Sequence, residues 1–118
     1  MRRILRDSPT AIPALNLAEA VDVLTRRFGV PIDRSRPIVE GLTATSLEVL
    51  PFDEEVAWVA ARLRSSRYHR VSRPLSMADC GLLAQAEVRG AVVASTDGHV
   101  VATAREEKMQ VIPLPPSS

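Results

Sequence analysis

Apolar and polar positions follow helical spacing in some stretches and form short apolar runs in others. The clearest helical stripe lies in residues 17–28 and comprises Leu17, Ala20, Val21, Leu24 and Phe28. Short apolar runs bounded by proline or glycine predict strands between the helices. The predicted strands are 10–15, 47–50, 92–95 and 110–114, and the predicted helices are 17–28, 33–42, 53–65, 76 to the stop at Gly90, and 98–107.

Side chains that favour helix starts precede four of these helices. They are Asn16, Asp33, Asp53 and Ser76. Alternating strands and helices predict an α/β fold with a mostly parallel central sheet and right-handed crossovers. We expect one domain over residues 1–118, with 115–118 as a loose tail and Met1–Arg6 as the end of a helix.

Three acidic residues stand out in this pattern. Asp79 lies near the start of the helix at 76, whose other residues are mostly apolar or small. Burying a carboxylate there costs free energy unless the carboxylate has a binding partner. Asp97 follows the strand 92–95, and Glu19 lies near the start of the helix at 17–28. Ligand crevices of parallel sheets lie at the carboxyl ends of strands, so we expect the three carboxylates to meet there.

Each acid also has a purely structural explanation. Asn16 with Glu19, and Ser76 with Asp79, have the spacing of a capping box, in which the side chains satisfy free N–H groups at a helix start. Asp97 before Gly98 suits a turn or a helix cap. Capping and metal binding are compatible, because a carboxylate has two oxygens.

Composition narrows the class of protein. The chain has 118 residues, a net charge of +1 and a single cysteine, Cys80. This charge gives no overall attraction to nucleic acid, and one cysteine excludes an internal disulfide or a cysteine-based metal cluster. Neither an apolar run of membrane-spanning length nor a signal peptide is present, so we expect a cytoplasmic protein without a membrane partner.

The segments PLSMADC…LLAQA, VVASTDGHV and ALNLAEAVDVL resemble the PIN domain, most of all the VapC-type toxins of bacterial toxin–antitoxin pairs. The resemblance runs from about Ile4 to the C-terminus. It implies a three-layer α/β/α sandwich in which Glu19, Asp79 and Asp97 converge in one pocket. It also implies an antitoxin partner and a homodimer.

The family pattern begins with a strand that ends in an aspartate, and the resemblance places this strand upstream of residue 1. We therefore expect an N-terminally truncated or mis-started form. Asp7 is too close to Glu19 to replace that aspartate, since a strand, a helix and a second strand would have to fit between them, so we interpret it as a loop residue.

The resemblance implies Mg²⁺- or Mn²⁺-dependent endonucleolytic cleavage of RNA. Oxygen ligands favour these ions, which activate water and neutralise phosphoryl charge. Asp79 and Asp97 would be the main ligands, and Glu19 would complete the set or position the attacking water. Ser95 matches a hydroxyl position beside the last acid and would orient it.

A basic stretch before the buried helix could grip RNA phosphates, with Tyr68 stacking on a base. Its candidate RNA-binding residues are Arg67, Tyr68, Arg70 and Arg73. The alternative is a solvated loop. We interpret His69 and His99 as surface residues, Cys80 as a small core residue, and Trp58 as either a core anchor or a partner-facing aromatic.

Two further functions remain as alternatives. A truncated PIN domain without catalytic activity could serve as a protein- or RNA-binding module. A small phosphate- or nucleotide-binding α/β domain is disfavoured, because no glycine-rich loop follows any predicted strand.

Overall fold

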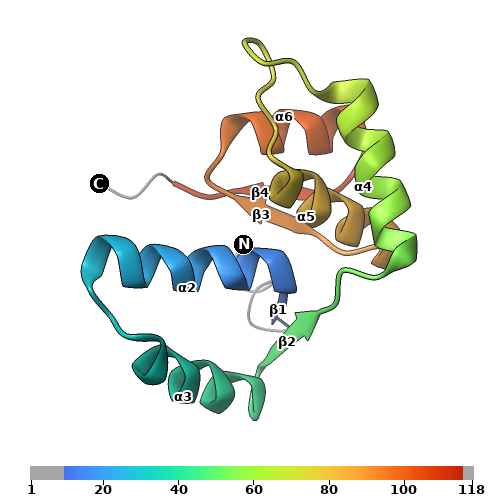
Figure 1. The fold of residues 1–118 in the computed structure, drawn as a ribbon. Helices are drawn as coiled ribbons and strands as arrows, with labels where there is room; N and C mark the ends of the chain where they lie inside the picture. Colours follow the sequence, from blue (N-terminus) through green and yellow to red (C-terminus); the bar gives the residue numbers. More distant parts are fainter. Residues whose placement is uncertain (1–9, 116–118) are drawn as a thin grey trace. The chain divides into compact units, whose positions relative to one another are not determined.

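The computed structural model describes residues 10–115, which fold into helices and parallel strands (Figure 1). The expectations for Met1–Arg6, Asp7 and residues 116–118 lie outside this range. In chain order the elements are β1 (Thr10–Pro13), α2 (Ala14–Phe28), α3 (Ile32–Thr43), β2 (Leu47–Leu50), α4 (Glu54–Arg67), α5 (Met77–Arg89), β3 (Val93–Ser95), α6 (Gly98–Glu106) and β4 (Val111–Pro113). The chain divides into two compact units, Met1–Pro51 and Phe52–Ser118, and each is described by itself.

In the first unit, β1 and β2 pair in parallel, with Thr10 opposite Leu47 and Pro13 opposite Leu50. The helices α2 and α3 connect the two strands, and Gly29 ends α2 in the left-handed conformation (φ 67°). The predicted strand 47–50 is confirmed residue for residue.

The predicted starts of α2 and α3 are wrong. Each helix begins directly after a proline, Pro13 or Pro31, and neither start has a side-chain cap. Proline presets φ near the helical value and has no N–H that needs a partner, so the helix can begin at the next residue. Asn16 and Asp33 therefore lie inside the helices and do not cap them.

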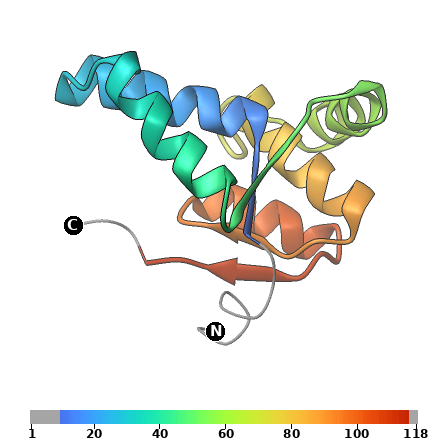
Figure 2. The same cartoon turned by 90° about the horizontal axis from the view of Figure 1, so that it is seen from below.

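The second unit is built around α5 and a parallel pair, β3 and β4, in which Val93 lies opposite Val111. The connecting helix α6 lies along both strands (Figure 2), and α4 packs against α5. Val56, Ala60 and Leu63 of the predicted inner stripe of α4 are buried, and Val59 packs at the edge of the core. The same cluster of buried residues also contains Leu75, Cys80, Leu83, Ala84, Ala86, Val93, Val100 and Ala104.

The predicted mixed α/β class with parallel strands is confirmed. Within residues 10–115 the strands form two parallel pairs, β1–β2 in the first unit and β3–β4 in the second. Each strand has only three or four residues, and each finds its partner within its own unit. No helix in the same range has the length and apolar character needed to cross a bilayer.

Candidate metal and nucleic-acid site

Asp79 is half-buried in the first turn of α5 and forms a complete capping box with Ser76. The Asp79 N–H donates to Ser76 Oγ at 3.0 Å, and the Ser76 N–H donates to Asp79 Oδ2 at 2.9 Å. The predicted capping role is thus confirmed. Among the described residues, Asp79 Oδ1 accepts no hydrogen bond, so this oxygen is available to a ligand.

Asp97 is the N-cap of α6. Its Oδ1 accepts from the N–H groups of His99 (2.8 Å) and Val100 (3.4 Å). Ser95 Oγ accepts from the main-chain N–H of Asp97 at 3.0 Å, so it positions the backbone of this residue and not its carboxylate. Asp97 is an exposed residue, and its Oδ2 accepts no hydrogen bond from residues 10–115.

Both acids therefore share one arrangement, in which one oxygen is fixed by backbone N–H groups and the other is unengaged. The turn at Gly90 reverses the chain between α5 and β3, so the start of α5 and the carboxyl end of β3 lie toward the same end of this unit (Figure 1). Each carboxylate also lies at a helix N-terminus, where the helix dipole favours negative charge.

Glu19 is exposed on α2, beyond the first turn of that helix. Its predicted capping box with Asn16 is wrong, because α2 starts at Ala14, and Asn16 Oδ1 is buried without a hydrogen-bond partner among the described residues. Glu19 belongs to the first unit and the other two acids to the second, so the meeting of all three stays a prediction. Residues 10–115 contain no group of three or more His, Cys, Asp or Glu residues arranged to hold a metal ion.

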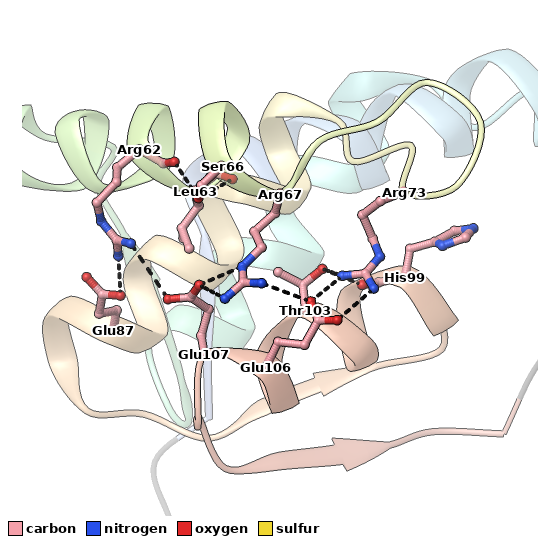
Figure 3. Close-up of polar contacts among 10 residues, drawn as sticks. All are labelled: Arg62, Leu63, Ser66, Arg67, Arg73, Glu87, His99, Thr103, Glu106 and Glu107. Carbon is pink, nitrogen blue, oxygen red and sulfur yellow. Dashed lines mark hydrogen bonds and ion pairs between the residues drawn. The ribbon is translucent and has the colours of Figure 1, made fainter.

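Two of the four candidate RNA-binding residues are occupied by ion pairs (Figure 3). Arg67 Nη2 lies 2.8 Å from Glu107 Oε2, and Arg73 Nη1 lies 2.8 Å from Glu106 Oε1. The hydrogen bond from Arg73 lowers the pKa of Glu106. For Arg67 and Arg73 to bind phosphate, the phosphate must displace these carboxylates.

The other two candidates are more accessible. Arg70 is exposed at the turn of the 68–75 loop and has no acidic partner within residues 10–115. Tyr68 is also exposed, but the Arg64 guanidinium lies over its ring, 4.3 Å from the centroid. One face of Tyr68 therefore already carries a cation, which leaves the opposite face for a base.

His69 organises this loop, although the sequence shows no partner for it. Its main chain pairs with Arg73 in an antiparallel bridge, and its Nδ1 accepts from the N–H groups of Val71 and Ser72, both at 3.1 Å. Cys80 is buried, as predicted, and burial raises the pKa of its thiol.

A hollow of about 320 Å³ lies at the opposite end of α5. None of the predicted acids lines it, and its side chains include Glu87, Glu107, Lys108 and Met109. The sequence places Arg64 in the basic stretch before the buried helix and gives no sign of its partner, the Leu75 carbonyl, to which Arg64 Nε donates at 3.2 Å beside Asp79. Only the packing of α4 against α5 brings this arginine there.

Comparison with known proteins gives one family. The family model of the PIN domain matches residues 1–107, which is most of the chain and includes all three predicted acids. No curated protein matches the chain significantly.

Proposed function

This chain belongs to the PIN domain family, whose members are generally metal-dependent nucleases, and we propose that it is a Mg²⁺-dependent endoribonuclease toxin of the VapC type. The proposal treats residues 1–118 as one cytoplasmic domain that hydrolyses RNA phosphodiester bonds. The observation that carries it is the shared arrangement of Asp79 and Asp97, each with one carboxylate oxygen fixed by backbone N–H groups and the other unengaged.

This arrangement suits a hydrated divalent cation. Mg²⁺ usually keeps several waters and binds through one or two carboxylates together with substrate phosphates, so a few well-held oxygens are enough. Asp79 and Asp97 would hold the ion, and Glu19 would complete the set or position the attacking water. Mn²⁺ has the same preference for oxygen and is an equivalent probe.

The ion would supply an activated water and neutralise the charge that grows on the phosphoryl oxygens. The residues of the chain supply the orientation. The Ser76 N–H fixes Asp79, the N–H groups of His99 and Val100 fix Asp97, and Ser95 fixes the backbone before α6. Carboxylates that are already held lose little conformational freedom when they bind.

Exposed apolar side chains support the antitoxin and homodimer parts of the proposal. Phe28 at the end of α2 is 69% exposed, and Ile32 and Ile38 of α3 are also exposed. Large apolar groups that cluster at a surface mark protein–protein contacts.

The second candidate function is a PIN domain without catalytic activity that binds a protein. Trp58 favours it, since this side chain is 70% exposed on α4 and aromatic residues are enriched in protein interfaces. The expectation of an upstream strand with a further aspartate stays a prediction. Translation of the DNA before the start codon tests it by showing whether such a strand is in frame.

Asparagine substitutions separate catalysis from the structural roles of the two acids. Asn caps a helix about as well as Asp, which covers Asp97, and its amide oxygen can accept from the Ser76 N–H in place of the Asp79 carboxylate. We expect Asp79→Asn and Asp97→Asn to lower Mg²⁺-dependent RNA cleavage by about 100-fold or more, with thermal stability nearly unchanged. Asp53→Asn is the control matched to Asp97→Asn, since Asp53 caps α4 as Asp97 caps α6, accepting from the Val56 N–H at 3.0 Å. If the unmodified chain neither cleaves RNA in Mg²⁺ nor binds Mn²⁺ in calorimetry, the second candidate replaces the first.

A further inference from the structure

One peptide group, between Leu75 and Ser76, is hydrogen-bonded at both ends. Its N–H belongs to Ser76 and donates to Asp79 Oδ2 at 2.9 Å. Its carbonyl belongs to Leu75 and accepts from Arg64 Nε at 3.2 Å. A cationic side chain of α4 is thereby connected, through a single peptide plane, to an acidic side chain of α5.

We propose that Arg64 is a positioning residue for Asp79, which acts by fixing the orientation of the Leu75–Ser76 peptide. The proposal deepens the proposed function and rests on it, because Asp79 is taken there as a metal ligand. No pattern in the sequence connects Arg64 with Asp79.

The direction of the two hydrogen bonds makes the connection favourable. A peptide whose oxygen accepts from a cation becomes a better donor at its nitrogen, because hydrogen bonds in a chain polarise one another. The acceptor at the far end is a carboxylate, so the bonds at both ends are charge-assisted. Arg64 therefore strengthens the contact that keeps Asp79 Oδ2 in the cap and Oδ1 unengaged.

The surrounding contacts hold this peptide and Arg64 in place. The Leu75 side chain is 1% exposed, and its N–H donates to the Arg73 carbonyl at 2.9 Å. The Ser76 carbonyl accepts from the Cys80 N–H at 3.0 Å. On the other side, the Arg64 guanidinium lies 4.3 Å from the Tyr68 ring centroid, which limits its freedom further.

The test compares Arg64→Gln, Arg64→Lys and Arg62→Gln in the full chain. Arg62 is the matched control because it also leaves α4 to bind other elements, Glu87 and Glu107, but it has no contact with the Leu75–Ser76 peptide. The measurements are hydrogen exchange of the Ser76 amide by NMR without metal, Mn²⁺ affinity by calorimetry, and thermal stability.

We expect Arg64→Gln to speed Ser76 amide exchange and to weaken Mn²⁺ binding by about tenfold, the lower end of the range known for residues behind metal ligands. Arg64→Lys should restore part of both, since a lysine can donate to the same carbonyl. Arg62→Gln should lower thermal stability without changing either quantity. A purely structural role for Arg64 would lower thermal stability alone.

A second pair of variants covers the case in which Arg64→Gln does not fold. Ser76→Ala removes the hydroxyl and keeps the N–H, whereas Ser76→Pro removes both. Proline is compatible with this position, because Pro13 and Pro31 precede helices with φ −62° and −64°, close to the −74° of Ser76. Weaker Mn²⁺ binding by Ser76→Pro than by Ser76→Ala supports the proposal, and equal binding by the two variants overturns it.

The positioning role of Arg64 and the proposed metal-dependent function can be disproved separately. An unchanged Ser76 amide in Arg64→Gln would overturn the positioning role, whatever the chain binds. A Ser76 amide that responds to Arg64, in a chain that binds no Mn²⁺, would overturn the proposed function and leave the control of Asp79 by Arg64 intact.

Discussion

Arg73 and Glu106 form a two-pronged ion pair, with Nη1–Oε1 at 2.8 Å and Nη2–Oε2 at 3.1 Å. Arg73 Nη1 also donates to Thr103 Oγ1 at 2.7 Å, so the arginine binds two successive turns of α6 (Figure 3). The pair ties the end of the 68–75 loop to the helix that Asp97 caps.

This ion pair predicts a pH dependence of stability. Arg73 lowers the pKa of Glu106 below its ordinary value of 4.5, so the carboxylate stabilises the folded state above that pH. The stabilisation is lost as the pH falls from 4.5 through the lower folded-state pKa. Urea unfolding at a series of pH values should show this loss in the unmodified chain and a flatter profile in Glu106→Gln. Glu55→Gln, at an exposed position without an ion pair in residues 10–115, should keep the original profile.

Arg70, which has no acidic partner within residues 10–115, predicts a salt effect on RNA binding. If Arg70 contacts a phosphate, Arg70→Gln should weaken the binding of single-stranded RNA and reduce the slope of log affinity against log salt by about 0.7. Arg36→Gln removes the same charge from α3 and should leave the slope unchanged. Equal slopes for the two variants would remove Arg70 from the proposed RNA interface.

The two glycines 90 and 98 predict opposite outcomes for one substitution. Gly90 ends α5 at φ 64°, and a Cβ there meets no atom within 4 Å. Gly90→Ala should therefore lower the free energy of unfolding by about 1–2 kcal/mol through backbone strain alone. Gly98 has an ordinary φ and equally open surroundings, so Gly98→Ala should be neutral or slightly stabilising. Chemical denaturation measures both, and a neutral Gly90→Ala would contradict the strain.

Buried and exposed apolar side chains should contribute differently to the free energy of unfolding. Leu83 is 0% exposed in the core between α4 and α5, so Leu83→Ala should lower the free energy of unfolding by about 2–5 kcal/mol. Trp58 is 70% exposed, so Trp58→Ala should change stability by about 0.5 kcal/mol at most. If Trp58→Ala weakens binding to a partner protein while stability is unchanged, this result supports the interpretation of Trp58 as an interface residue.

Helix starts show where sequence reasoning succeeds and where it fails. Asp53, Ser76 and Asp97 cap their helices as the sequence predicts, because each side chain accepts from an N–H only two or three residues away. Asn16 and Asp33 have equally suitable side chains, yet the prolines Pro13 and Pro31 start those helices earlier. The chemistry of a cap is local, but the choice between two nearby starts depends on the fold around them.

The same distinction between local and tertiary information applies to the candidate site. The sequence alone determined that Asp79 and Asp97 stand at helix starts, and it located the strand Leu47–Leu50 and the buried stripe of α4, since all of these depend on spacing within a few residues. Only the tertiary structure decided that Arg64 binds the Leu75 carbonyl and that Arg73 binds Glu106. The partner of a long charged side chain depends on which elements the core brings together, and no local pattern in the chain carries that information.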